Sequence, residues 1–245
     1  MCTVTYIPLD NQQFILTSNR DESALRSPKN ISPVLRGGKK MIFPRDTTAG
    51  GTWIAAAAND RVVCLLNGAF EKHQHQPPYA KSRGIMLMEF FDLTSAHRFC
   101  QDYEFRGMEP FTMIVAERQK LYEIRWDETQ LFFKTCPANE AHIWSSTTLY
   151  SEDIREKRER WFAQWLLKQR RFNTENILQF HRNAGDGDPE NDLIMNRNSI
   201  VQTVSITSIL KENQGIKMQY HDLIHSNLKK AEIKLEREIL ESHQS

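Results

Sequence analysis

Cysteine is scarce in this sequence, and long apolar runs are missing from it. The four cysteines stand far apart and form no CxxC pair, so neither a zinc ribbon nor a dense disulfide framework is indicated, and reduced thiols are expected. No stretch approaches the roughly 20 apolar residues that a membrane-spanning helix needs, and the start lacks the basic and apolar regions of a signal peptide. We therefore expect a cytoplasmic protein without a membrane span.

An excess of charge of either sign is also missing. The chain has 32 basic and 31 acidic residues and a net charge of +1, so its composition does not favour nucleic acid as a partner. The length of 245 residues is sufficient for a sizeable core, and neither an internal repeat nor an interdomain linker is recognisable. We expect residues 1–245 to form one domain whose function depends on local motifs.

The spacing of apolar residues predicts strands and helices in an irregular order. Strands are predicted at 2–6, 13–17, 52–56, 61–66, 110–116, 121–126, 130–134, 199–209 and 216–221. Helices are predicted at 83–91, 95–102, 152–169, 174–182 and 226–241, and long loops at 19–45, 71–78 and 183–189. Runs of strands interrupted by pairs of helices, without strict βαβ alternation, indicate a layered α+β fold with antiparallel sheets.

Cys2 directly follows the initiator methionine. Cysteine is small enough to favour removal of that methionine, after which Cys2 would carry both a thiol and a free amine. The amine has an ordinary pKa of about 7.7–8.0 and the thiol one of about 8.5, so the amine can accept the thiol proton near neutral pH. Asp21 could then orient the amine, and Arg20 could stabilise the thiolate or a substrate carboxylate. The residues also allow a small core cysteine and a loop ion pair between Arg20 and Asp21.

Five short motifs in the first 85 residues occur together in one known family. They are Met1-Cys2-Thr3, Ser18-Asn19-Arg20-Asp21-Glu22, Gly50-Gly51-Thr52-Trp53-Ile54, Leu66-Asn67 and Lys81-Ser82-Arg83-Gly84. In these motifs the chain resembles the NRDE family, also called the transport and Golgi organisation protein 2 family. That family is similar in its front half to N-terminal nucleophile (Ntn) hydrolases of the choloylglycine hydrolase and penicillin V acylase type. The resemblance implies a four-layer αββα sandwich with two stacked antiparallel sheets.

The resemblance also implies an activity and assigns residues to it. It implies a cysteine hydrolase that cleaves a linear amide C–N bond of a small acylated substrate through an acyl-enzyme, without a cofactor or metal. Cys2 is then the nucleophile with its own amine as base, Asp21 orients the amine, Asn67 donates to the oxyanion, and Arg20 supplies positive charge. The expected substrate-binding residues are Asn19, Trp53, Ser146, which stands where the hydrolases have a later asparagine, and Arg197, a late basic residue.

A second function remains open at this point. His73 and His75, followed by Pro77-Pro78, could bind a metal or haem, although a solvated loop is the alternative because no third ligand has a recognisable spacing. Family members have been linked to haem mobilisation, so the alternative function is a non-catalytic haem or lipid carrier, or a trafficking protein that uses the same pocket. The run from Arg155 to Arg160 interleaves acids and bases at helical spacing, and we interpret it as a solvated helix face.

Overall fold

The computed structural model describes residues 3–24 and 31–236, which contain two antiparallel β-sheets. In sheet A the strand order is β10-β1-β2-β12-β13-β14, and β11 pairs with β12. Its strands are β1 (Thr3–Pro8), β2 (Phe14–Glu22), β10 (His142–Ser145), β11 (Asn196–Arg197), β12 (Val201–Lys211), β13 (Gly215–Asp222) and β14 (Asn227–Lys234). A 3-10 turn, η1 (Asp10–Gln12), joins β1 to β2.

Sheet B is a meander in which each strand pairs with the next along the chain. Its strands are β3 (Val34–Arg36), β4 (Lys39–Ile42), β5 (Ile54–Ala57), β6 (Arg61–Asn67), β7 (Phe111–Glu117), β8 (Lys120–Trp126) and β9 (Leu131–Cys136). Antiparallel neighbours need no crossover, and most of these connections are short, but the one between β6 and β7 spans residues 68–110.

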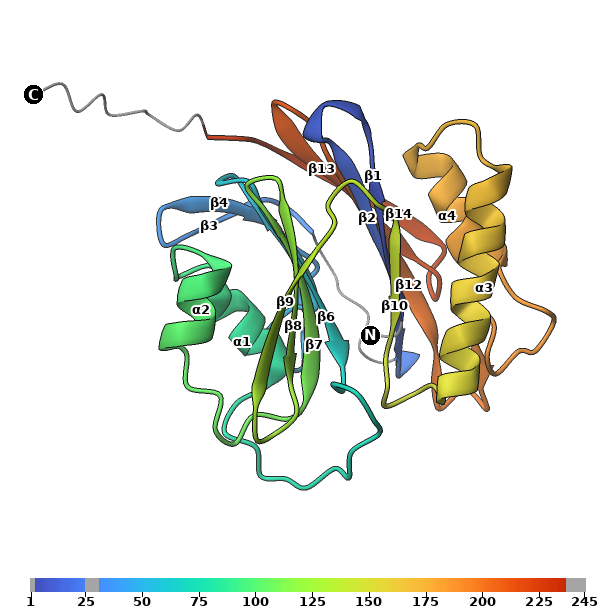
Figure 1. The fold of residues 1–245 in the computed structure, drawn as a ribbon, viewed down its shortest axis with the longest axis horizontal. Coiled ribbons are helices and arrows are strands. Elements are labelled where there is room, and N and C mark those ends of the chain that lie inside the picture. The colour runs from blue at the N-terminus through green and yellow to red at the C-terminus, as the bar shows by residue number, and fades with distance from the viewer. Residues whose placement is uncertain (1–2, 25–30, 237–245) are drawn as a thin grey trace, which may run out of the picture.

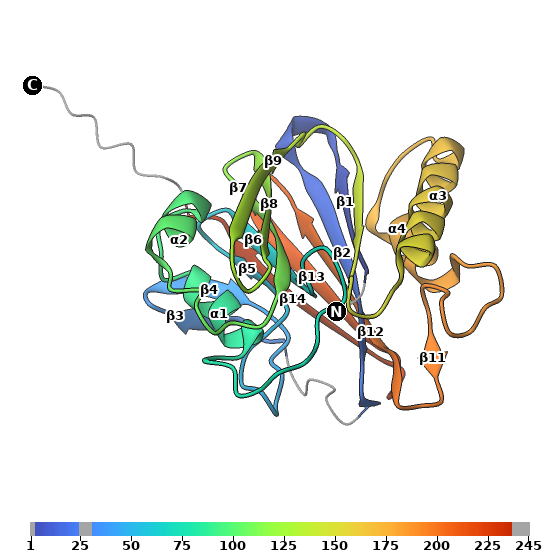
Figure 2. The same cartoon turned by 60° about the horizontal axis from the view of Figure 1, so that its bottom comes forward.

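Two pairs of helices cover the outer faces of the sheets. Sheet B carries α1 (Arg83–Phe90) and α2 (Ala96–Asp102), and sheet A carries α3 (Glu152–Lys168) and α4 (Thr174–Asn183), as Figures 1 and 2 show. The four-layer αββα sandwich is therefore confirmed. None of the described helices has the length and hydropathy of a membrane-crossing segment.

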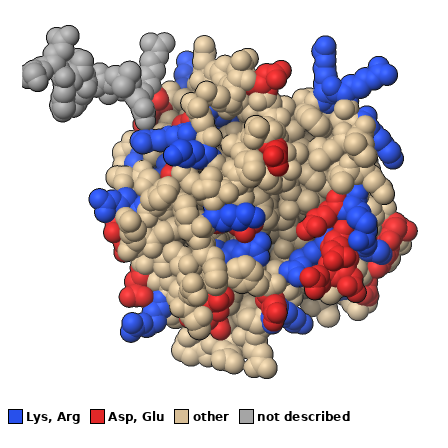
Figure 3. Space-filling model, in the orientation of Figure 1, with Lys and Arg blue, Asp and Glu red and all other residues tan. Residues whose placement is uncertain are grey.

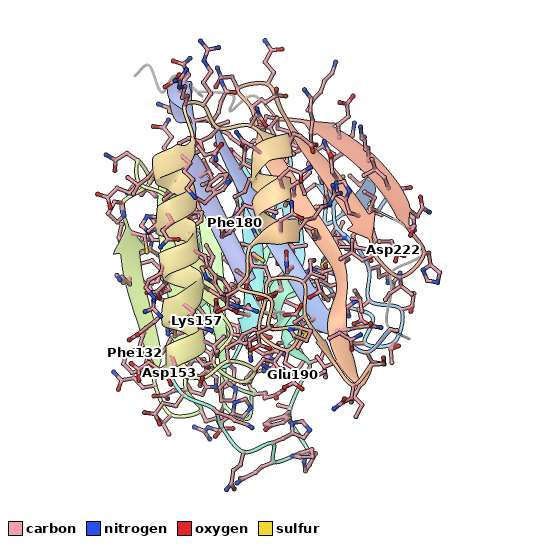
Figure 4. The ribbon with its side chains drawn as sticks, turned by 90° about the vertical axis from the view of Figure 1, so that its right-hand side faces the viewer. Phe132, Asp153, Lys157, Phe180, Glu190 and Asp222 are labelled. Carbon is pink, nitrogen blue, oxygen red and sulfur yellow. The ribbon has the colours of Figure 1, made fainter. Side chains whose placement is uncertain are left out.

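Strand alternation distributes the side chains over three apolar cores. On β1, Val4 and Tyr6 pack between the two sheets, whereas Ile7 packs with α3 and α4. A further core fills the space between sheet B and its helices. Phe180 lies in the α3–α4 layer (Figure 4). It packs against Phe162 and Trp165 with ring centroids 5.4 and 5.2 Å apart.

The helix predicted at 226–241 is wrong. Its described part contains β14, which pairs antiparallel with β13 along its whole length, from Asn227 opposite Asp222 to Lys234 opposite Gly215. The alternating pattern fits a strand, with Ile233 buried and the neighbouring Glu232 facing the other side. Pairing with β13 therefore determines the local structure of this charged segment, although its apolar residues are spaced as in a helix.

The loop predicted at 19–45 is also wrong in part. β2 continues to Glu22, and β3 and β4 form a hairpin around Gly37-Gly38. Both glycines have positive φ, 53° and 76°, which glycine adopts readily. The strand β10 was not predicted; it pairs with β1 over Thr3–Tyr6 and thereby lies beside the candidate site.

Candidate functional site

The candidate site surrounds the start of β1. The first described residue, Thr3, pairs with Asn19 on β2 and with Ser145 at the end of β10. The residues that follow on those two strands, Arg20, Asp21 and Ser146, therefore frame this end of β1. The predicted nucleophile, Cys2, lies outside the described residues, so the structure tests only its surroundings.

The other three cysteines make poor nucleophiles. Cys64, Cys100 and Cys136 are free, and burial raises the pKa of the Cys64 and Cys100 thiols to about 12. Burial and the nearby Glu123 also raise the pKa of Cys136. Since the thiolate is the reactive form, these three cysteines remain inert thiols at neutral pH.

The strand β2 sends the residues of its polar motif to opposite faces. Arg20 points between the sheets, where its guanidinium lies 4.0 Å from the ring centre of Trp53. Asn19 and Asp21 point to the other side, toward the helical layer. Arg20 and Asp21 therefore do not form an ion pair with each other, which excludes the alternative of a loop ion pair between them.

Arg20 is paired with an aspartate from sheet B. Its Nη2 lies 2.6 Å from Oδ2 of Asp46, and both side chains are almost completely buried. The other carboxylate oxygen of Asp46 accepts hydrogen bonds from the backbone N–H groups of Thr48 and Ala49. Because the carboxylate compensates the guanidinium, the positive charge expected from Arg20 is balanced within the fold.

Asp21 is held by two hydroxyl donors. Tyr150 donates to Oδ2 at 2.7 Å, and Thr203 donates to Oδ1 at 2.6 Å. The aspartate is only 3% exposed. These hydrogen bonds fix the carboxylate on the helical side of the start of β1, as an orienting group for a terminal amine requires.

Two arginines flank the ring of Tyr150. The guanidinium carbons of Arg158 and Arg197 lie 3.6 and 5.3 Å from its centroid. Arg158 is fully buried and donates to the hydroxyl of Thr3, which contradicts the prediction that the run from Arg155 to Arg160 is a solvated face throughout. The two guanidinium groups thus pack on the ring of the residue that donates to Asp21.

Arg197, the predicted late basic residue, binds to loop atoms. It donates to the backbone carbonyls of Glu190 and Leu149 at 3.1 and 3.0 Å, and to Oδ1 of Asn191 at 3.0 Å. Its guanidinium thus supports Tyr150 and the loop around it. These contacts give Arg197 a supporting position, and its role in substrate binding stays a prediction.

Asn19 ties β2 to the helical layer. Its amide nitrogen donates to the carbonyls of His181 and Leu193, and its Oδ1 lies 2.6 Å from Nδ1 of His181. Burial, together with the nearby Arg158, lowers the pKa of His181 to about 3, so the ring is neutral. Since Oδ1 can only accept, Nδ1–H is the donor, and Nε2 accepts from the hydroxyl of Thr5 at 2.8 Å. Every polar atom of the Asn19 amide is thus bound within the fold.

Asn67 and Ser146 meet across the two sheets. The hydroxyl of Ser146 donates to the backbone carbonyl of Asn67 at 2.8 Å. The Asn67 side chain is half-buried and makes no hydrogen bond within the described part of the chain. Asn67 ends β6 in the same row as Val63 and Leu65, which faces α1, so strand alternation directs its amide toward the α1 side of sheet B, and its role as oxyanion donor stays a prediction.

A close contact between two backbone segments requires glycine in two of the motifs. A Cβ on Gly51 would lie 2.3 Å from the carbonyl carbon of Gly84, so the two backbones touch. The N–H of Thr52 donates to the carbonyl of Gly84 at 3.2 Å. This contact joins the Gly-Gly-Thr-Trp and Lys-Ser-Arg-Gly motifs and fixes Trp53 beneath Arg20.

A polar patch lines the space between the sheets next to Arg20. Ser205 and Thr207 of β12 stand opposite Arg20 and Ser18 of β2. Their hydroxyls and Nε1 of Trp53 are buried and have no hydrogen-bond partner among the described residues. Buried polar atoms are normally bonded, so this patch can bind the polar atoms of a ligand.

The histidine pair does not form a metal site. Nε2 of His73 and Nδ1 of His75 both contact Oε1 of Glu109, at 3.1 and 3.3 Å, while Arg83 binds its Oε2 at 3.0 Å. In the ranges that the structure covers, no group of three or more His, Cys, Asp or Glu side chains is arranged to hold a metal ion. Arg83 already neutralises the carboxylate that the two histidines contact.

Sequence reasoning missed Tyr150, Thr203, Arg158 and Asp46. The first three lie more than a hundred residues from the motif that they support, and no spacing rule connects them to it. For Asp46, its position in a Pro- and Gly-rich segment before Gly50-Gly51 indicated only a turn.

Comparisons with known proteins agree with this fold. The structure resembles the N-acylethanolamine-hydrolyzing acid amidase ortholog of Caenorhabditis elegans, with a TM-score of 0.55 and 13% identity over 85% of this chain and 92% of that chain. It also resembles a C2A mutant of the conjugated bile acid hydrolase of Clostridium perfringens, with a TM-score of 0.56 and 8% identity over 94% and 96% of the chains. Both likenesses show an Ntn-hydrolase-like fold.

Sequence comparison identifies the family. A search of curated proteins finds no match. The family model described as Transport and Golgi organisation 2 matches residues 1–234, almost the whole chain. The resemblance seen in the motifs is thereby confirmed, and the chain belongs to the Transport and Golgi organisation 2 family.

Proposed function

We propose that this protein is a cytosolic cysteine hydrolase of the N-terminal nucleophile type, which cleaves a linear amide bond of a small acylated substrate. The observation that supports this best is the position of the Asp21 carboxylate. Tyr150 and Thr203 hold it beside the start of β1, and Cys2 directly precedes that strand in the sequence. The similar structures bear the names of an amidase and a conjugated bile acid hydrolase, which suggests the same reaction class for this chain.

The chemistry follows from the residue types. After loss of Met1, the free amine of Cys2 takes the thiol proton, and the thiolate attacks the amide carbonyl carbon. The C–N bond then breaks, the ammonium returns the proton to the leaving amine, and a thioester remains on Cys2. Water, deprotonated by the same amine, attacks the thioester carbonyl carbon. The C–S bond then breaks, the carboxylic acid leaves, and the ammonium returns its proton to the Cys2 thiolate. Asp21 orients the amine, and Asn67 at the end of β6 is the candidate donor to the oxyanion.

The polar patch between the sheets suggests how such a substrate is oriented. The free hydroxyls of Ser205 and Thr207 and the indole N–H of Trp53 can bind a substrate amide or hydroxyl group. The carboxylate of Asp46 balances Arg20, so this side of the site favours a neutral polar group over a second free carboxylate.

The test begins with an intact mass of protein expressed with its native start. A mass lower by one methionine is expected. Turnover of N-acyl aminocoumarins of several chain lengths should then be measured for the wild type, Cys2→Ala and the matched control Cys100→Ala. The proposal predicts loss of turnover in Cys2→Ala alone, with unchanged thermal unfolding.

Two results contradict the proposal. One is retention of Met1, since the thiol would then have no adjacent free amine. The other is turnover in Cys2→Ala equal to that of Cys100→Ala. Haem or lipid binding by both variants, without any turnover, would favour a carrier instead.

A further inference from the structure

A large cleft opens at the end of the sandwich opposite the start of β1. We name it the upper cleft because the connections that form it lie at the top of Figure 1: β1–β2, β5–β6, β7–β8, β9–β10 and α3–α4. Its volume is about 1130 Å³, slightly above the range of roughly 300–1,000 Å³ typical of small-molecule sites. None of the candidate catalytic residues lines it.

Positive charge dominates the rim of the upper cleft. Five cationic residues line the cleft: Arg118, Lys120, Arg170, Arg171 and Lys211. Lys120, Arg170 and Arg171 are exposed and form no ion pair within the described residues. In the space-filling view, Lys and Arg side chains project at the upper right, where α3 ends, whereas acidic and basic groups mix further down (Figure 3).

The acidic groups of the upper cleft are largely neutralised within the fold. Glu117 is buried against Arg61, with 3.0 Å between Oε2 and Nε, and its other oxygen accepts from the N–H of Ala96. Asp60 faces the ammonium of Lys211 at 3.4 Å. Asp10 is the remaining carboxylate among the lining residues, so the rim attracts anions.

The floor and walls of the upper cleft are partly apolar. Tyr6 and Phe14 pack with ring centroids 5.1 Å apart, and Phe172 lines the cleft from the α3–α4 connection. The hydroxyl of Tyr6 donates to the carbonyl of Ala138 at 3.0 Å, so its polar atom is bound within the fold. A concave apolar floor below a ring of cations is complementary to a small amphiphilic anion.

We propose that the upper cleft binds a small soluble ligand in which a phosphate or carboxylate group is joined to a short apolar group. The exposed cations Lys120, Arg170 and Arg171 bind the anionic group, and the rings of Tyr6, Phe14 and Phe172 receive the apolar group. A concave site fits a single molecule better than a flat membrane surface. This site is separate from the proposed hydrolase site and does not depend on it.

The test is titration calorimetry with hexyl phosphate, hexanoate and inorganic phosphate against the full chain. Hexyl phosphate or hexanoate should bind more tightly than inorganic phosphate, and binding should weaken as salt is added. The double variant R170E/R171E should lose roughly tenfold or more in affinity, since it reverses two rim charges. The control K72E/R106E changes the net charge by the same amount at exposed positions outside the cleft and should bind the probes like the wild type.

The outcomes separate the possibilities. Preference for hexyl phosphate over hexanoate identifies a phosphate ligand, and the reverse preference identifies a carboxylate. An equal loss of affinity in R170E/R171E and K72E/R106E overturns the proposal, because it shows a general effect of net charge. Absence of binding to all three probes overturns it too.

Discussion

The buried His181 predicts a specific pH dependence of stability. The ring is fully buried between Asn19 and Thr5, and its pKa is lowered from 6.5 to about 3. Between these two values the unfolded chain binds a proton that the folded chain does not. Stability is therefore fully present above pH 6.5 and falls as the pH is lowered toward 3.

Over most of this pH range, the loss of unfolding free energy depends only on the pKa of His181 in the unfolded chain. With an unfolded value of 6.5 and a folded value well below 5, lowering the pH from 7 to 5 removes about 2 kcal/mol of unfolding free energy through this one residue. The limiting slope is about 1.4 kcal/mol per pH unit. The ring is completely buried, so solvent screening does not reduce this figure.

The assay is urea denaturation at several pH values between 7 and 5, with His181→Gln beside the wild type. The variant should be less stable at every pH because Thr5 and Asn19 lose their partner. Between pH 7 and 5, however, its unfolding free energy should decrease by about 2 kcal/mol less than that of the wild type. The control His97→Gln removes an exposed imidazole and should retain the wild-type pH dependence. Parallel curves for the wild type and His181→Gln would refute the reasoning.

Two further predictions concern the framework of the site and of the cleft. Gly51→Ala should destabilise the protein by about 1–3 kcal/mol in urea denaturation, because the new Cβ would lie 2.3 Å from the backbone of Gly84; an unchanged midpoint would contradict this close contact. Glu117→Gln should lower the unfolding free energy by about 3–5 kcal/mol, because it leaves the buried Arg61 without its carboxylate, and a loss below 1 kcal/mol would show that the pair contributes little.

The sequence predicted most of the fold because most elements depend on local pattern. The helix predicted at 152–169 is observed at Glu152–Lys168, and the strand predicted at 61–66 is observed at Arg61–Asn67. Here apolar spacing and turn residues agree with the tertiary structure. The four-layer arrangement itself came from the family resemblance, since periodicity does not determine how two sheets stack.

The failure at β14 has a physical reason. In Asn227–Lys234, Leu228 and Ala231 are three residues apart, as on a helix face, whereas Ala231 and Ile233 alternate with charged residues, as on a strand face. The segment is an edge strand, where lysines are common because they discourage pairing with other chains. Its structure is fixed by β13 through hydrogen bonds between strands, and these cannot be recognised from the spacing within one segment.

The site was predictable only where it is contiguous in sequence. The motif residues Arg20 and Asp21 could be found because they are adjacent, but the motif does not reveal that Asp46 and Tyr150 are their partners. These contacts depend on the stacking of the two sheets and on the loop before α3. Sequence analysis therefore identified the motif but not the groups that bind and balance it.

The structure also decides which variants can test catalysis. Asn19, Arg20 and Asp21 each bind buried partners, so their substitution lowers stability whether or not they take part in a reaction. Loss of activity in such variants is therefore ambiguous. Asn67 differs because its amide is half-exposed and makes no hydrogen bond in the described ranges, so Asn67→Ala should leave the fold intact. If Asn67 is the oxyanion donor, this variant should retain thermal stability and lose about 10²–10³ in turnover, whereas unchanged turnover would remove it from the mechanism.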